Sequence, residues 1–255
     1  MKLFEDNKPP QDAAALLSAL FREFKEVPAS VASKTLSPSG LACQVACALK
    51  LQGIEMEPQK ESFQSRCFTD CGEDRHLRIQ EFLSHTPYWV DVATYVKDKN
   101  LPLDVIRQDG FEVLLQHKSL PIRFKCDGML LIEGLYYILE IKTERGCVNS
   151  FRTSYDPKHQ KQGITYTLML GTNKILWLYE GREMLEQKPF VQVVTKDEQE
   201  DMLKYLNQIV ENKDRIEVLS KDEKSCPYCP YKKYCRDYFK ELKKKEKASE
   251  RVQRK

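Results

Sequence analysis

The sequence lacks long hydrophobic runs. Its first residues, MKLFEDNKPPQD, hold charges and prolines in place of the apolar segment of a secretory signal. No later stretch contains the ~18 uncharged apolar residues that a membrane span needs. Repeats and low-complexity linkers are absent as well. These absences predict a cytoplasmic protein with no membrane partner.

The 255 residues are enough for one sizeable domain with an appended element. We expect one domain over residues 1–239, whose helical N-terminal part, core and cysteine-bearing segment span 1–70, 71–212 and 213–239. Residues 240–255 follow as a basic tail with eight Lys or Arg against three Glu, although the net charge of the whole chain is only +3. Such a tail either steers a polyanion toward the protein or is simply a solvated C-terminal helix.

The chain has nine cysteines, an odd number that does not suit a disulfide framework. In the cytosol, cysteines are expected to bind metal or to stay buried as thiols. Cys226, Cys229 and Cys235 lie within the ten residues CPYCPYKKYC. Closely spaced thiols beside turn-forming prolines serve little packing purpose, so this segment predicts a metal site that takes a further ligand from elsewhere in the chain.

Apolar spacing and capping signals predict an α/β fold in which helices cover a mixed sheet. A helix is expected at 12–26, a second from an N-cap at Ser37 to a stop at Gly53, and a third after Gly72. The elements expected beyond these are a β-hairpin over 120–144 with its turn at Glu133-Gly134, a helix at 156–171, strands at 174–181 and 189–195, and a helix from Thr195 or Lys196 to Lys213.

The hairpin carries the most informative residues. Side chains alternate along a strand, so Glu140 and Lys142 in ILEIKT share one face while Leu139 and Ile141 point to the other. Counting outward from the turn brings Asp127, on the preceding strand, opposite Glu140. Two facing carboxylates repel each other unless a cation lies between them. The alternative is that Glu140 and Lys142 form the exposed face of an amphipathic strand and that Asp127 lies at the surface.

A hard divalent ion fits such a carboxylate pair. Mg²⁺ or Mn²⁺ binds one or two carboxylates together with waters and substrate phosphate. The ammonium group of Lys142 is placed to orient a water or to offset charge on phosphorus. These groups are the equipment of metal-assisted phosphodiester hydrolysis. A D…ExK pattern by itself arises often by chance, so the interpretation depends on the residues around it.

Two flanking segments supply that context. GEDRHLRIQ places His76 near a helix start, and HQKQGITY spaces His159, Gln162 and Tyr166 along one helical face. In chain order, SPSGLACQVAC, GEDRH, CDG, EIK, QGITY and the final C-x2-C-x5-C resemble the RecB-type PD-(D/E)XK nucleases of the iron–sulfur exonuclease branch, which includes the CRISPR-adaptation exonuclease and phage-encoded relatives. The resemblance implies a restriction-endonuclease-like core with a mixed central sheet.

The resemblance also implies a metal site and a reaction. His76, Asp127, Glu140 and the backbone carbonyl of Ile141 would bind the catalytic Mg²⁺ or Mn²⁺. The implied reaction is in-line attack on the phosphodiester by a metal-activated water, which leaves a 5′-phosphate. The proline that usually precedes the first carboxylate is absent here, because Cys126 occupies that position.

Further roles are implied for residues on the second strand and the following helix. Lys142 would be the catalytic lysine. Gln162 and Tyr166 would contact the scissile region of the DNA and brace the lysine, and His159 would be the basic residue that precedes them.

In the iron–sulfur branch, one cysteine from an N-terminal helix and three from the C-terminal segment hold a 4Fe-4S cluster. The resemblance assigns these positions to Cys47, Cys226, Cys229 and Cys235, so that the cluster would clasp the two ends of the chain together. Cys43, one helical turn before Cys47, competes for the fourth position.

Other interpretations of the cysteines stay open. Zinc also accepts four thiolates, and spacing alone does not separate zinc from iron. A metal-free loop of reduced thiols is the plainest alternative. Cys67 and Cys71 form a further close pair whose role the sequence does not assign.

The expected activity is that of a metal-dependent DNA exonuclease acting on single-stranded DNA or DNA ends, in recombination, repair, replication, or phage or CRISPR DNA processing. The alternative is a non-catalytic nucleic-acid-binding module with a structural metal site, because lysines neutralise phosphate and aromatic rings stack on bases. A separate helicase, recombinase or CRISPR-adaptation protein is the kind of partner implied. If a phage encodes the chain, the host cytoplasm is where it would act.

Overall fold

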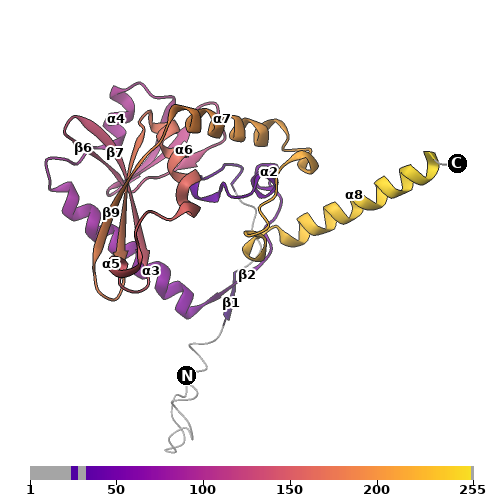
Figure 1. Cartoon of the computed structure of the whole chain (residues 1–255), viewed down its shortest axis with the longest axis horizontal. Helices are drawn as coiled ribbons and strands as arrows, with labels where there is room; N and C mark the ends of the chain where they lie inside the picture. Colours follow the sequence, from indigo (N-terminus) through magenta and orange to yellow (C-terminus); the bar gives the residue numbers. More distant parts are fainter. Residues whose placement is uncertain (1–23, 28–32, 254–255) are drawn as a thin grey trace, which may run out of the picture.

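The computed structural model describes residues 24–27 and 33–253 (Figure 1). Its largest described sheet contains β6 (Gly128–Ile132), β7 (Leu135–Glu144), β8 (Lys174–Gly181) and β9 (Gln187–Val193), in that spatial order. β7 and β8 are parallel, whereas β6 pairs with β7 and β9 pairs with β8 in the antiparallel direction. The predicted mixed sheet is therefore confirmed.

The predicted hairpin is formed by β6 and β7, but it begins at Gly128 and not at residue 120, because residues 123–124 pair with residues 115–116 in another sheet. Ile132 pairs with Leu135, so Glu133 and Gly134 form a two-residue turn, and both have positive φ angles of 50° and 77°. Such a turn matches the twist of the flanking strands and fixes their register. The two-residue turn therefore also determines which residues lie opposite each other at the open end of the hairpin.

Helices cover both faces of this sheet. On one face, α3 (Phe63–Ser84) brings Ile79 against Leu139 and Ile141 of β7. On the other face, α6 (Gln160–Leu170) packs within the larger core. This α/β arrangement, with a mixed sheet flanked by helices, is the predicted fold class (Figure 1).

Gly163 lets α6 approach the sheet closely. A Cβ atom at this position would lie 2.4 Å from Cδ1 of Ile175 and 2.9 Å from the ring of Trp177, both on β8. The glycine that weakens a helix by propensity is therefore required by packing. Its place brings the polar side chains of α6 over β7.

Two further helices follow the predicted boundaries at one or both ends. α7 (Lys196–Glu211) starts with a capping box between Thr195 and Glu198. α2 (Gln44–Gln52) ends at Gly53, whose φ of 78° lies in the left-handed region. Helical spacing in the sequence also predicts a helix in each of the segments that form α6 and α7.

The other described elements were only partly predicted. The polar region before the hairpin forms α4 and a small antiparallel sheet, and the C-terminal segment continues into a long helix that projects away from the sheet (Figure 1). These elements are α4 (Val92–Asp98), β3 (Leu103–Asp109), β4 (Glu112–His117), β5 (Arg123–Phe124), α5 (Val148–Phe151), the 3₁₀ turns η1 (Pro38–Gly40), η2 (Pro157–His159), η3 (Ile216–Val218) and η4 (Cys226–Tyr228), and α8 (Lys232–Gln253).

Three predicted helix boundaries are corrected. Residues 12–23 of the first predicted helix lie outside the described residues, but residues 24–26 belong to strand β1 (Phe24–Val27), which pairs with β2 (Gln59–Ser62). Pairing with a distant strand here overrides the local helical spacing.

The second and third helices start elsewhere than predicted. Ser37 makes no capping hydrogen bond, and the chain forms the short turn η1 before α2 begins. α3 begins at Phe63, well before Gly72, because the Ser62 side chain accepts a 3.0 Å hydrogen bond from the backbone N–H of Ser65. Gly72 lies inside this helix.

None of the helices in the described part of the chain is both long and apolar enough to cross a bilayer.

Candidate active site and cysteine cavity

Asp127 and Glu140 meet at the open end of the hairpin. The β6–β7 ladder ends with Gly128 opposite Leu139, and Asp127 and Glu140 are the next residues outward on the two segments. Both residues are buried, at 9% and 4% exposure. The predicted carboxylate pairing thus agrees with the observed strand register.

The Asp127 carboxylate is held from two elements. Its Oδ2 atom accepts a 2.6 Å hydrogen bond from the backbone N–H of Ile141, and its Oδ1 atom lies 3.2 Å from Nδ1 of His76 on α3. The structure therefore brings His76, which is 51 positions earlier in the chain, to the hairpin. Ile141 contacts this carboxylate through its N–H, and the predicted use of its carbonyl remains a prediction.

The Glu140 carboxylate is held by two side chains through one oxygen. Nζ of Lys142 lies 2.7 Å from Oε1, and Nε2 of Gln162 donates to the same atom at 2.6 Å. Oε2 accepts no side-chain hydrogen bond from the described residues. One carboxylate oxygen is therefore fixed by the protein, and the other is available for another partner.

The electrostatics of the pair favour a bound cation. Burial and the charge of Asp127 raise the pKa of Glu140 to about 7, although Lys142 acts in the opposite direction. Burial disfavours the protonated form of His76, but its hydrogen bond with Asp127 and the charge of that carboxylate outweigh this effect and raise the histidine pKa. Negative charge is thus in excess at the site, which a divalent ion would offset.

The α6 residues reach the site as a chain of hydrogen bonds. Gln162 accepts from Lys142 at 3.3 Å and donates to the hydroxyl of Tyr166 at 3.1 Å. The Tyr166 hydroxyl in turn donates to the backbone carbonyl of Lys125 at 2.8 Å. Gln162 therefore contacts the lysine directly, whereas Tyr166 acts on it through Gln162.

His159 differs from the basic residue that the resemblance implies. Its ring stacks on Trp177 with centroids 5.6 Å apart, and its Nδ1 atom lies 3.2 Å from the Tyr179 hydroxyl. Burial lowers its pKa to about 4, and the charge of Lys142 acts in the same direction. In the protein without metal or DNA the neutral imidazole is therefore favoured near pH 7, and the basic role that the resemblance implies stays a prediction.

Gln80 is a further residue at the site that was not predicted from the sequence. This residue is fully buried on α3, one helical turn after His76, and its Nε2 atom donates to the backbone carbonyl of Asp127 at 2.7 Å. Its Oε1 atom has no hydrogen-bond partner among the described residues. The spacing of four residues from His76 was the available signal, but glutamines at that spacing are too common to single out.

The donor set at the hairpin fits a hard divalent ion that keeps most of its water ligands. Within residues 24–27 and 33–253, no three His, Cys, Asp or Glu side chains converge as a group that could hold a metal ion. Mg²⁺ is commonly bound through only one or two carboxylates, with waters and substrate phosphate completing the shell. Asp127 and Glu140 supply these two carboxylates. Oε2 of Glu140, which accepts no side-chain hydrogen bond from the described residues, is the type of oxygen ligand that such an ion binds.

Four thiols gather at a second place. Cys43, which precedes α2, lines a cavity of about 400 Å³. The other cysteines that line it are Cys226 of η4, Cys229 between η4 and α8, and Cys235 of α8. Cys47 does not line it, because its Sγ atom points toward the carbonyl of Gly40 at 3.4 Å. Burial raises the Cys47 pKa to about 12. The cavity lining thus favours Cys43, whereas the sequence resemblance favours Cys47.

Other cysteines do not line this cavity. Cys67 and Cys71 lie on the first half of α3, and Cys126 is buried beside Asp127. Burial raises the pKa of the Cys126 thiol, which agrees with its interpretation as a small buried strand residue.

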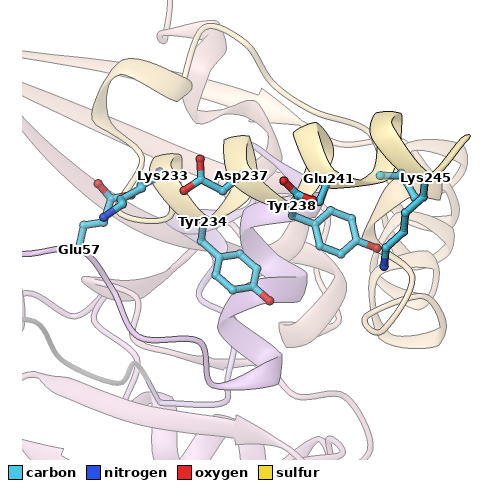
Figure 2. Close-up of a pocket in the computed structure, with 8 residues that line it drawn as sticks. Glu57, Lys233, Tyr234, Asp237, Tyr238, Glu241 and Lys245 are labelled. Carbon is cyan, nitrogen blue, oxygen red and sulfur yellow. The ribbon is translucent and has the colours of Figure 1, made fainter. Parts of the chain in front are cut away.

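A groove of about 540 Å³ runs along α8 (Figure 2). It contains none of the predicted catalytic residues, so it is separate from the carboxylate site. Its lining alternates carboxylates with lysines and tyrosines: Glu57, Lys233, Tyr234, Asp237, Tyr238, Glu241, Leu242 and Lys245.

Part of the chain matches a known protein family. Residues 130–236 match the family model described as the PD-(D/E)XK nuclease superfamily. The matched segment contains Glu140, Lys142, Gln162 and the C-terminal cysteines, whereas Asp127 and His76 precede it. No curated protein matches the chain.

Several solved structures are similar at low sequence identity. The crystal structure of SSO0001 has a TM-score of 0.41 and 14% identity, covering 78% of this chain and 84% of that one. An alkaline exonuclease from Laribacter hongkongensis has a TM-score of 0.41 and 10% identity, covering 72% and 91%. Its complex with dAMP gives a TM-score of 0.39 and 13% identity with the same coverage. Likenesses this distant do not establish a shared activity. The match over residues 130–236 confirms the resemblance to the PD-(D/E)XK nuclease superfamily, whereas membership of its iron–sulfur branch stays a prediction.

Proposed function

We propose that the protein is a metal-dependent deoxyribonuclease, and more specifically an exonuclease that acts on single-stranded DNA or DNA ends. The observation that carries the proposal is the convergence of Asp127, Glu140, Lys142 and Gln162 at one end of the hairpin. The superfamily match over residues 130–236 supports a nuclease. The exonuclease preference and a role in DNA recombination, repair, replication, or phage or CRISPR DNA processing rest on the sequence resemblance.

Asp127 and Glu140 would hold Mg²⁺ or Mn²⁺, with His76 and the Ile141 carbonyl as further contributors. When bound, the ion supplies Lewis-acid activation of water and stabilises charge on the phosphate. Burial of the two carboxylates keeps bulk water from screening their charge. His76, which contacts Oδ1 of Asp127, helps to fix the orientation of that carboxylate.

Lys142 provides the positive charge beside the reacting phosphate. Its ammonium group lies 2.7 Å from the Glu140 carboxylate and 6.0 Å from the ring centroid of Trp177. These two neighbours restrict where the ammonium group can lie. Gln162 holds both Lys142 and Glu140, and Tyr166 anchors Gln162 to the backbone carbonyl of Lys125, between β5 and β6. A pre-positioned ammonium group stabilises charge developing in the transition state without further reorganisation.

The test is cleavage of single-stranded DNA labelled at either the 5′ or the 3′ end, in Mg²⁺ or Mn²⁺. Wild-type protein should shorten the DNA from one end, and Lys142→Met should lose at least about 100-fold in rate. Lys174→Met, on the neighbouring strand β8, is the matched control and should cleave normally. Binding without cleavage in every divalent ion, unaffected by Asp127→Ala, would favour the non-catalytic binding module.

We further propose that the cysteine cavity holds a 4Fe-4S cluster as a structural clasp. Zinc also accepts four thiolates, and it is the alternative occupant that the test below separates from iron. A four-iron cluster takes one thiolate at each iron, and four thiols, those of Cys43, Cys226, Cys229 and Cys235, line this one cavity. Lys221, Lys232 and Arg236 also line the cavity and outnumber its one carboxylate, that of Glu223, so the charged side chains favour an anionic cluster.

Anaerobic purification tests the clasp. Stoichiometric iron and sulfide with absorbance near ~400 nm would support the cluster, whereas stoichiometric zinc without that absorbance would overturn it. Cys229→Ser should lose bound metal and folding stability, and any loss of activity should follow only from these losses. Asp127→Ala should stay folded and keep its cluster while it loses cleavage, because the two sites use different residues.

A further inference from the structure

Tyr231 lies between the cysteines of the C-terminal segment and is tied to both sides by its backbone. Its carbonyl accepts a 2.9 Å hydrogen bond from the backbone N–H of Cys235. Its own backbone N–H favours the thiolate of Cys229 through a hydrogen bond. The tyrosine backbone is therefore part of the wall that positions two of the thiols.

The side chain of Tyr231 is buried, with 4% of the residue exposed, and it lines the same cavity as Cys43, Cys226, Cys229 and Cys235. Its hydroxyl is fully buried and has no hydrogen-bond partner among the described residues. An unpaired buried hydroxyl destabilises a fold, and a phenylalanine ring would pack as well without that cost. A partner for the hydroxyl is therefore expected among the side chains that form the cavity wall.

The groups facing the cavity determine what that partner is. The possible side-chain acceptors along the cavity are the Glu223 carboxylate and the cysteine sulfurs, whereas Lys221, Lys232 and Arg236 only donate. Of these acceptors, only the Cys229 sulfur acts electrostatically on the Tyr231 hydroxyl. Thiolate sulfurs accept hydrogen bonds and are the groups that a bound metal would fix in place. A tyrosine hydroxyl has an ordinary pKa of about 10, so it can donate a hydrogen bond at neutral pH.

We propose that the Tyr231 hydroxyl donates a hydrogen bond to a thiolate sulfur of the metal-bound cysteine site. This inference rests on the proposed thiolate site and adds a positioning residue to it. Hydrogen bonds to ligand sulfur withdraw charge from the metal centre, raise the reduction potential of an iron–sulfur cluster and stabilise the thiolate ligand. Tyr231 would therefore set the potential of the bound cluster and slow the loss of metal.

The experiment compares wild-type protein with Tyr231→Phe and with Tyr228→Phe, all purified anaerobically as full-length chains. Tyr228 is the matched control because it belongs to the same segment but is 89% exposed. Iron, sulfide and zinc contents are measured first. The rate of metal loss to an excess of chelator and, for iron-containing protein, the reduction potential are measured next.

Tyr231→Phe should bind as much metal as wild type, because it keeps the ring and all four thiols. It should lose metal about tenfold faster, as expected for one lost hydrogen bond to a charged acceptor. The reduction potential of its cluster should shift to a more negative value, and Tyr228→Phe should match wild type in both measurements.

Two outcomes would overturn the inference, and they are distinguishable. Equal rates of metal loss and equal potentials in Tyr231→Phe and wild type would remove the hydroxyl from the site while leaving the metal site intact. Wild-type protein that contains neither iron nor zinc would overturn the thiolate site and the inference together.

Discussion

The side-chain amide of Gln162 on α6 donates a 2.6 Å hydrogen bond to Oε1 of Glu140 on β7. Lys142 approaches the same carboxylate oxygen at 2.7 Å and the Gln162 carbonyl oxygen at 3.3 Å. Three side chains from two elements therefore constrain one another in a closed triangle. The position of the candidate catalytic lysine depends on how closely α6 packs on the sheet.

Gln162→Ala should lower DNA cleavage by about 10- to 100-fold, the range found when a residue that orients a metal ligand is removed. The protein should stay folded, because Tyr166 and the apolar face of α6 still pack. Gln160→Ala, on the exposed side of the same helix, is the control and should cleave at the wild-type rate. Equal activities of the two variants would contradict the role of Gln162.

Glu140→Gln should raise the melting temperature in the absence of divalent ions at pH 8, although it removes cleavage. Burial and the charge of Asp127 disfavour the ionised form of Glu140, which is the form present above its raised pKa of about 7. A neutral amide avoids that cost and keeps an oxygen for Lys142. Thermal unfolding in EDTA measures the difference.

Adding Mg²⁺ should then raise the melting temperature of the wild-type protein but not that of Glu140→Gln. Glu133→Gln, at the exposed hairpin turn, should respond to Mg²⁺ as wild type does. A wild-type melting temperature that ignores Mg²⁺ at all concentrations up to tens of millimolar would argue against a cation site between the carboxylates.

Glu180 should make stability depend on pH in the acid range. Its fully buried carboxylate accepts hydrogen bonds from Gln187, Arg75 and Arg78, which outweigh the effect of burial and lower its pKa. A lowered folded-state pKa stabilises the protein fully above the unfolded-state value of about 4.3, and this contribution is lost as the pH falls through the folded-state pKa.

Glu180→Gln should therefore cost about 2 kcal/mol in unfolding free energy near pH 7. The cost should shrink below pH ~4, where the wild-type carboxylate also becomes neutral. Urea unfolding from pH 3 to pH 7 measures both values, with Glu211→Gln at the exposed end of α7 as the control. A cost that stays constant across this range would exclude the carboxylate charge as its source.

Cys43→Ser should lose the bound metal, whereas Cys47→Ser should retain it. The first residue lines the cavity with the three C-terminal cysteines, and the second is buried toward Gly40. Metal content after anaerobic purification is the measurement, and unfolding of each variant in urea shows whether either serine disturbs α2. The reverse result would restore Cys47 as the fourth ligand, as the sequence resemblance implies.

Local geometry made several features predictable from sequence. The Glu133-Gly134 turn and the two-residue period of a strand place Asp127 opposite Glu140, with Lys142 on the same face as Glu140. The capping box at Thr195 marks the start of α7 in the same way. Each of these signals lies within a few residues of the structure it determines.

Other elements gave no such signal. Almost the whole of β3 is exposed, so it has no alternation of buried and exposed residues that a sequence pattern would reveal. Residues 24–26 have helical spacing, but they form a strand because β2 lies beside them. In both cases the partner of the segment, and not its own composition, determines the structure.

The sequence by itself determined the facing carboxylates, the lysine beside them and the helical face that bears Gln162, because short-range periodicity and turn chemistry set those relations. Only the tertiary structure brought His76 to Asp127, buried Gln80 beneath the same residue, neutralised His159 between aromatic rings and placed Cys43 at the cavity of the C-terminal thiols. These contacts join elements far apart in the chain, and packing of helices on the sheet decides which side chains meet and how deeply they are buried.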